Sequence, residues 1–226
     1  MTNIAENIQR YRSKLDGSSC RLIAISKTKP QESVLEAYAT GQREFGENKV
    51  QDLAAKYEAL PKDIQWHMVG HLQRNKIKYI APFVYLIHSV DSIRLLEAIQ
   101  KEGKKIDRVI PVLLQVHIAE EEAKFGFDAE ELKELMQSDL LAAMTHVAIK
   151  GLMGMATNTP DQDKISQEFR LLKGLLSELN AISSFELTEL SMGMSGDYEL
   201  AVREGSTMIR IGTDIFGKRD YATPVV

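Results

Sequence analysis

The sequence predicts an α/β fold, a TIM-type (β/α)8 barrel with one extra helix in front of it. First, eight short apolar runs typical of buried strands alternate with helical patterns, about every 25 residues. Second, the 226 residues come close to the roughly 250 of such barrels. Third, no Gly-x-Gly-x-x-Gly turn follows the first strand, which disfavours a doubly wound sheet. Without a linker or a shift in composition, residues 1–226 are expected to form a single barrel domain.

The first half of the chain contains the extra helix and four of the strands. One helical face of residues 3–16 carries the residues Ile4, Ile8, Tyr11 and Leu15. Gly17 is expected to end this helix. Strands are expected at residues 21–27, 43–48, 64–69 and 83–88. Helices are expected at 30–41, with Pro30 in the first position, at about 50–60, from about 74, and at about 91–103, where Asp91 is the predicted cap.

The second half continues the same alternation. Residues 109–116 are apolar almost throughout, which is typical of a parallel strand buried on both faces. Because Pro111 lacks an N–H group, strand pairing is expected mainly after it. Asp128 and Glu131 form a predicted capping box for the next helix. The remaining strands are expected at 146–153, 185–190 and 207–211, the longest helix from 159, a short helix at 196–204 and a short turn at 213–216.

Composition excludes several classes of function. The net charge of −4 argues against a nucleic-acid partner, because phosphate backbones are bound by clustered Lys and Arg. Cys20 is the single cysteine, so an intrachain disulfide is impossible, and we expect a packed or surface thiol in a reducing cytoplasm. The first residues lack signal-peptide features, and no apolar run approaches the roughly 20 residues of a membrane span. A cytoplasmic monomer without a membrane partner is expected.

Lys27 ends the first strand and is the central candidate residue. The carboxyl ends of barrel strands form the face where ligands bind. Desolvation at this edge lowers the pKa of an ammonium group toward values at which the amine attacks a carbonyl. A strand-end lysine that extends its amine into solvent is the plain alternative.

Two loops on the same face carry anion-binding features. The loop 191–197 contains Met194 and Ser195, with Ser195 near the start of a predicted helix. Gly212 and Thr213 follow the eighth strand and offer a backbone N–H and a hydroxyl. Ser195 alone would be read as a helix cap, but loops after strands seven and eight form the usual barrel phosphate site. Met194 is expected to fill the barrel top beside the ligand.

Three further side chains are expected near this mouth. Arg210 and Gly212 are two residues apart along the strand, so both are expected to face the barrel interior. There the guanidinium needs either a carboxylate or a ligand atom as acceptor. Asn48, after the second strand, either orients a ligand or caps a helix. His67 and His71 are four residues apart but lie in a strand-like run without a third ligand, so no metal is expected. The histidines expected to be packed or at the surface are His88, His117 and His146.

A lysine amine, a phosphate cradle and an inward arginine together indicate a phosphorylated aldehyde as the ligand. Pyridoxal 5′-phosphate (PLP) fits all three: the lysine forms the imine, the two loops take the phosphate and the arginine meets the ring nitrogen. An arginine in this position disfavours protonation of the ring, so carbanion chemistry would be assisted only weakly.

The sequence also resembles the pyridoxal-phosphate homeostasis proteins, which are single-domain relatives of the alanine racemase barrel. The matching stretches are residues 24–30, 45–48, 66–73, 88–91, 151–153, 190–195, 210–213 and 215–217. The resemblance implies a Schiff base at Lys27, phosphate contacts from Ser195, Gly212 and Thr213, Arg210 near the ring nitrogen, and Asn48 beside the cofactor. It further implies a protein that carries and buffers PLP without an established reaction, and that hands it to PLP-dependent apo-enzymes.

Three departures from the family pattern affect the rim: Lys49 in place of an aromatic residue, Ser92 in place of an arginine, and the loop 155–160. Two enzymatic alternatives stay open. One is an amino-acid racemase or lyase, although the chain leaves no room for the second domain that supplies the second base of alanine racemase. The other is a class I aldolase-like barrel that binds a sugar phosphate at Lys27.

Overall fold

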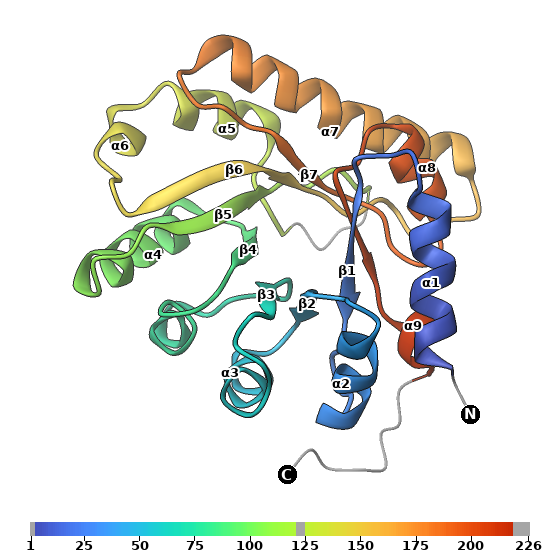
Figure 1. The fold of residues 1–226 in the computed structure, drawn as a ribbon. Helices are drawn as coiled ribbons and strands as arrows, with labels where there is room; N and C mark the ends of the chain where they lie inside the picture. Colours follow the sequence, from blue (N-terminus) through green and yellow to red (C-terminus); the bar gives the residue numbers. More distant parts are fainter. Residues whose placement is uncertain (1–2, 121–124, 219–226) are drawn as a thin grey trace.

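The computed structural model describes residues 3–120 and 125–218, and its strands form one closed parallel barrel (Figure 1). Each strand pairs with the next in sequence, and the eighth pairs with the first. The strands are β1 (Arg21–Ile25), β2 (Glu44–Glu47), β3 (Gln65–Met68), β4 (Leu86–Val90), β5 (Ile110–Gln115), β6 (Val147–Met153), β7 (Glu189–Ser191) and β8 (Met208–Ile211). The predicted TIM-type barrel is confirmed.

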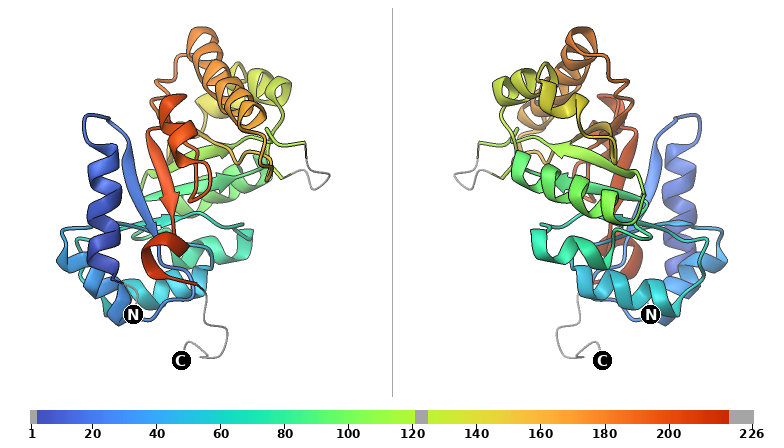
Figure 2. Two further views of the ribbon diagram at one scale, coloured as in Figure 1. Left: turned by 90° about the vertical axis from the view of Figure 1, so that its right-hand side faces the viewer. Right: turned by 90° about the vertical axis from the view of Figure 1, so that its left-hand side faces the viewer.

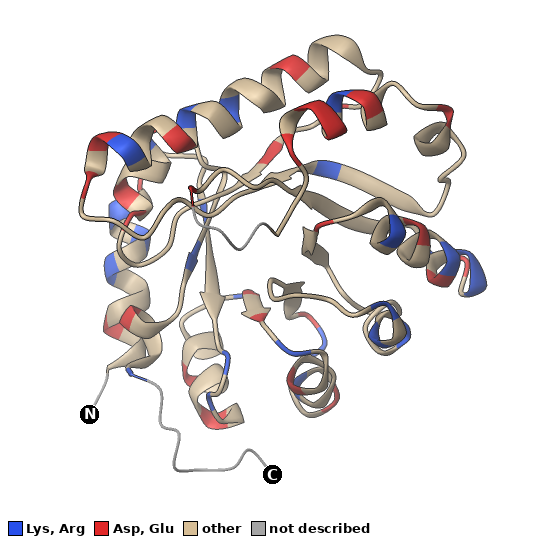
Figure 3. Cartoon of the chain, turned by 180° about the vertical axis from the view of Figure 1, so that it is seen from behind, with Lys and Arg blue, Asp and Glu red and all other residues tan. Residues whose placement is uncertain are grey.

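Helices surround this barrel (Figure 2). They are α1 (Ile4–Leu15), α2 (Gln31–Ala39), α3 (Val50–Ala59), α4 (Ile93–Lys105), α5 (Ala129–Met136), α6 (Asp139–Ala142), α7 (Gln162–Ile182), α8 (Tyr198–Arg203) and α9 (Thr213–Phe216), with the 3₁₀ helix η1 at Arg74–Tyr79. Basic and acidic residues are interspersed along them (Figure 3). In the part of the chain that the structure describes, no helix combines the length and apolarity needed to cross a bilayer.

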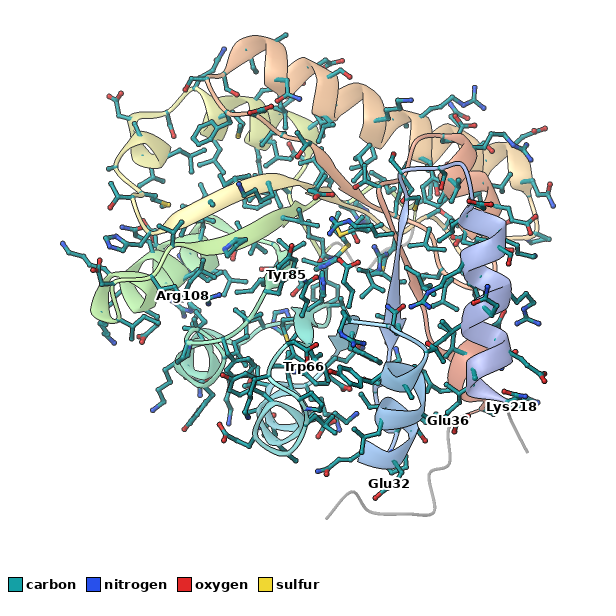
Figure 4. The ribbon with its side chains drawn as sticks, in the orientation of Figure 1. Glu32, Glu36, Trp66, Tyr85, Arg108 and Lys218 are labelled. Atoms are coloured by element: carbon teal, nitrogen blue, oxygen red, sulfur yellow. The ribbon has the colours of Figure 1, made fainter. Side chains whose placement is uncertain are left out.

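The sheet separates two apolar layers, because successive strand residues point to opposite faces. A small cluster fills the barrel interior and consists of Ile23, Ile25, Leu86, Leu113, Met153 and Met208. The larger cluster lies between the sheet and the helices. Trp66, fully buried, belongs to this outer layer and lies between β3 and α3 (Figure 4). Cys20 is a buried free thiol, and burial raises its pKa to about 11.

Several strand boundaries differ from the prediction. β4 begins at Leu86, since the amide N–H groups of Phe83 and Val84 both bond the Ile80 carbonyl in a helical turn. β7 covers only Glu189–Ser191. Pro111 is paired within β5, in contrast to the expectation. Because Ile110 donates toward β6, Pro111 faces β4, where pairing starts only at Val112.

Helix starts show one correct prediction and two wrong ones. Pro30, predicted in the first position of its helix, is the N-cap of α2. The capping box of Asp128 and Glu131 at the start of α5 is present. The predicted Asp91 cap is wrong, because Ser92 is the N-cap of α4 and its hydroxyl accepts from the Leu95 amide. The single turn of α6 was not predicted at all. These differences move element ends by a few residues and leave the strand order unchanged.

The helix α7 offers a matched test of the outer layer. Phe169 is fully buried, whereas Leu171, two residues on, is 60% exposed. Phe169→Ala is expected to lower the free energy of unfolding by about 3–5 kcal/mol, measured by urea denaturation. Leu171→Ala, on the solvent side, should change it by less than about 0.5 kcal/mol. Equal losses in the two variants would contradict the assignment of the buried face.

Candidate functional site

The carboxyl ends of β1 and β8 lie against each other at the barrel mouth. Lys27 follows Ile25 by two residues, so the period of the strand directs it to the inner side, where it is half-buried. At Gly212, an added Cβ would lie 3.3 Å from the Ile25 carbonyl oxygen. This close approach brings Gly212 and Thr213 beside the strand end that carries Lys27.

Thr28, directly after Lys27, has two unusual features. Its φ of 63° lies in the left-handed region, which is uncommon for a β-branched residue. Its Oγ1 is buried, and within residues 3–120 and 125–218 it has no hydrogen-bond partner. A strained backbone and an unsatisfied buried oxygen beside Lys27 are typical of a functional site.

A buried ion pair fixes the end of β1 from the outside of the barrel. The Glu47 Oε1 atom accepts from the Ser26 hydroxyl at 2.6 Å and from Lys56 Nζ at 2.6 Å. Lys56 Nζ also donates to the Ser26 carbonyl oxygen at 2.8 Å. Burial raises the pKa of Glu47, while the Lys56 ammonium opposes this rise. The pair ties the residue before Lys27 to both β2 and α3, and the sequence analysis missed it.

Asn48 lies at the mouth after β2 and is half-buried. It does not cap the following helix, because the N-cap of α3 is Lys49. A Cβ at Gly70 would lie 2.4 Å from the Asn48 carbonyl oxygen, so only glycine allows the loop after β3 to approach this closely. The loops after β2 and β3 therefore pack tightly together around Asn48.

The loop between β7 and α8 carries Ser195, which is half-buried. Ser195 is not a helix cap, since the N-cap of α8 is Asp197, whose carboxylate accepts from the Met194 amide at 2.6 Å. Gly193 has φ of 95°, and a Cβ there would lie 2.5 Å from the Ala201 Cβ. Met194 is 39% exposed rather than packed in the barrel top, which corrects the sequence expectation.

The leading helix α1 supports both candidate anion loops (Figure 2). Tyr11 donates to the Asp214 carboxylate in α9 at 2.7 Å, and its ring packs edge-on against Tyr198 in α8 with 5.0 Å between centroids. Asn7 donates to the Ile215 carbonyl at 3.1 Å. The extra helix therefore holds in place the two short helices that begin beside Ser195 and at Thr213.

Arg210 points into the barrel, as its parity predicts, and its side chain is buried. Its NH1 donates to the Ser191 carbonyl at 2.7 Å and to the Ser191 hydroxyl at 2.6 Å, and NH2 donates to the Gly154 carbonyl at 3.2 Å. The acceptors are thus neutral oxygens, neither the carboxylate nor the ligand atom that the sequence analysis considered. Burial lowers the Arg210 pKa to about 10, against the opposing charge of Asp197.

Two buried histidines continue from Arg210 into the barrel. His88 Nδ1 lies 2.8 Å from the Ser191 hydroxyl oxygen, and His88 Nε2 lies 2.8 Å from His67 Nδ1. Burial is the main cause that lowers the pKa of both imidazoles. Among the described residues, no group of three potential ligands can hold a metal ion. The contact between these two histidines is not predicted by the sequence, because it depends on the register between β3 and β4.

Comparison with known proteins agrees with this architecture. Residues 1–220 match the model of the alanine racemase N-terminal domain. The pyridoxal phosphate homeostasis protein of Aquifex aeolicus is 40% identical over 224 residues, which cover 98% of this chain and 97% of that protein. The protein of the same name from Schizosaccharomyces pombe is 34% identical, covering 99% of this chain and 96% of the relative.

Solved structures resemble the chain over nearly its whole length. PipY of Synechococcus elongatus without PLP superposes with a TM-score of 0.89 at 39% identity, covering 95% of this chain and all of that one. The structure of PipY with PLP bound gives 0.85 at 38% identity, with the same coverage. Alanine racemase from Corynebacterium glutamicum gives 0.70 at 15% identity, and 62% of that chain is covered, so it shares the fold alone.

The fold and the family model define the class: a (β/α)8 barrel of the alanine racemase N-terminal type. Within this class, the full-length matches are decisive. The chain belongs to the family of pyridoxal phosphate homeostasis proteins.

The buried pair Glu47–Lys56 predicts a pH-dependent stability. Lys56→Met is expected to cost about 3–5 kcal/mol of unfolding free energy, because it leaves a carboxylate buried without its cation. The pKa of Glu47 in the folded state then rises further above its unfolded value of about 4.3. An acid with a raised folded pKa loses stability as pH increases between the two values, so the deficit should widen from about pH 5 to about pH 8.

Urea denaturation across that pH range measures the effect. The double variant Glu47→Gln/Lys56→Met removes the carboxylate, so its deficit relative to the wild type should vary less with pH than that of Lys56→Met. A deficit in Lys56→Met that stays constant with pH would contradict the role assigned to the pair.

Proposed function

We propose that the protein binds PLP through a Schiff base between the cofactor aldehyde and Lys27, and that it carries and buffers the cofactor. The observation that carries this proposal is the shared mouth: Lys27 at the end of β1, the loops of Ser195 and Thr213 after β7 and β8, and the inward cation of Arg210. PipY, a relative of similar length, has been solved with PLP bound, which supports the same ligand here.

Each site residue has a distinct proposed role. The Lys27 amine attaches to the aldehyde. The Ser195 and Thr213 hydroxyls and the Gly212 amide hold the phosphate, in the position usual for barrels. Arg210 donates to the ring nitrogen, and Asn48 and Met194 line the mouth. Bound PLP would supply an electrophilic carbon and an electron-withdrawing ring.

The arrangement favours a carrier over an enzyme. NH1 of Arg210 donates twice to Ser191, and a guanidinium has no acceptor site to offer. Facing such a donor, the ring nitrogen would stay unprotonated and withdraw electrons weakly. The curated relatives are named as homeostasis proteins. We infer a cytoplasmic monomer of one barrel domain that supplies PLP-dependent apo-enzymes.

The lysine assignment has a matched control two residues away. Lys27→Ala is expected to abolish the visible absorbance of the PLP-loaded protein and the mass increment trapped by borohydride reduction. Lys29→Ala should keep both, because Lys29 Nζ is occupied by the Lys218 carbonyl at 2.8 Å. Trapping of PLP at Lys29, or unchanged spectra in Lys27→Ala, would refute the assignment. Trapping of a sugar phosphate at Lys27 without PLP would select the aldolase-like alternative. Steady turnover of an amino acid would select the racemase or lyase.

The phosphate assignment is tested with two forms of the ligand. Thr213→Val is expected to weaken PLP binding about tenfold, the effect of one hydrogen bond to a charged group. Binding of pyridoxal, which lacks the phosphate, should not change. Fluorescence titration gives the dissociation constants of both ligands. An equal loss of affinity for PLP and for pyridoxal would place Thr213 elsewhere in the site.

A further inference from the structure

A continuous line of polar side chains crosses the barrel interior from the mouth to the base. It begins at Arg210 in β8, passes Ser191 in β7 and His88 in β4, and ends at His67 in β3 and Glu44 in β2. The contacts after Arg210 are 2.6, 2.8 and 2.8 Å. The last, from His67 Nε2 to Glu44 Oε1, is 3.6 Å, an ion-pair distance that is too long for a hydrogen bond.

The two ends of this line impose the same direction of donation. A guanidinium only donates, so the Ser191 oxygen accepts from Arg210 and its proton goes to another acceptor. The available acceptor is His88 Nδ1. A neutral imidazole that accepts at Nδ1 carries its proton on Nε2, so His88 donates to His67 Nδ1.

The base of the barrel gives the same tautomer of His67 independently. Nε2 of His67 faces the Glu44 carboxylate, which can only accept a hydrogen, so the proton of His67 belongs on Nε2. The opposite tautomer would place a lone pair against that carboxylate. Glu44 is itself held by Arg21 at 2.8 Å. A donor at one end and an acceptor at the other therefore leave one consistent set of tautomers.

We propose that His67 and His88 are positioning residues for Arg210: both are held neutral as Nε2–H tautomers, which keeps the Ser191 hydroxyl turned as an acceptor toward the guanidinium. Both NH1 hydrogens are thereby committed to Ser191. In the part of the chain that the structure describes, this leaves Nε–H and one hydrogen of NH2 for a ligand. Its consequence for PLP rests on the function proposed above.

The charges around His88 disfavour its protonation, whereas around His67 burial, the largest effect, lowers the pKa against the Glu44 and Glu189 carboxylates, which raise it. His67 lies beside Glu44 and the Tyr85 ring, and the charges of Arg21 and Glu189 also act on it. His88 contacts His67 and Ser191, and the charges of Arg210 and Arg21 also act on it. Protonation of His88 would place a second cation beside Arg210 in the barrel interior. Burial acts in the same direction on both imidazoles.

The tautomers are measured directly on the full chain labelled with ¹⁵N, in the absence of PLP. Long-range ¹H–¹⁵N correlation spectra distinguish Nδ1–H from Nε2–H, and His67→Gln and His88→Gln assign the signals. We expect both histidines to stay in the Nε2–H form from about pH 5.5 to about pH 8.5. Protonation of either one within this range, or an Nδ1–H tautomer, overturns the proposal.

Two buried serines provide the matched variants. Ser191→Ala removes the link between Arg210 and His88. Ser206→Ala removes a hydroxyl that bonds backbone carbonyls of β7, of β8 and of the loop after β7, and that lies away from both histidines in the hydrogen-bond network. We expect Ser191→Ala to mix the His88 tautomers and to weaken PLP binding about tenfold. Ser206→Ala should preserve both the tautomers and the PLP affinity.

The two proposals fail in different ways. A wild-type protein that shows the expected tautomers but does not bind PLP would overturn the proposed function and leave the positioning role intact. A wild-type protein that binds PLP while its two histidines titrate would overturn the positioning role alone. A Ser191→Ala variant with wild-type tautomers would also overturn it.

Discussion

The buried guanidinium of Arg210 is the constraint on which the rest of the interior depends. A cation inside a barrel needs acceptors, and a neighbouring carboxylate would neutralise the charge that the site presents to a ligand. Here the acceptors are oxygens of Ser191 and Gly154, so the charge persists. At the base, Glu44 and Glu189 bind Arg21, and at the mouth the charge of Asp197, in the loop after β7, also acts on Arg210. The barrel therefore has an ion-paired cluster at its base and, nearer the mouth, a guanidinium whose hydrogen-bond acceptors are neutral oxygens.

Contacts outside the barrel also hold the loops of the mouth in position. Glu47 and Lys56 pin Ser26, and α1 pins the starts of α8 and α9. These contacts come from elements far apart in sequence, but each ends one to three residues from a candidate ligand contact. A site composed of loops needs such support, because loops alone hold side chains less exactly than strands do. The strained Thr28 lies two residues after Ser26, which the Glu47–Lys56 pair holds.

The sequence predicted what depends on local periodicity and on barrel topology. Strand order, the inward direction of Arg210 and the position of Lys27 follow from the two-residue period and from the common edge of parallel strands. It did not predict contacts that depend on register between strands, such as that of His67 with His88. The apolar Phe83 was read as strand, whereas its ring stacks on Tyr57 at 3.8 Å outside the sheet. Two of the three acceptors of Arg210 were missed because they are backbone carbonyls, which have no signature in the sequence; the third, the Ser191 hydroxyl, depends on the register between β7 and β8.

In the barrel interior, hydrogen bonds are donated in one direction, from Arg210 toward Glu44. This arrangement also bears on how a carrier differs from an enzyme on the same fold. A racemase needs a ring that accepts electrons and groups that exchange protons with the substrate. In this barrel the groups behind Arg210 are neutral, buried and committed to each other, so they offer no proton to a ligand at the mouth. Under the proposed function, such an interior would orient a bound aldehyde without activating it, a combination that suits reversible storage of a reactive cofactor.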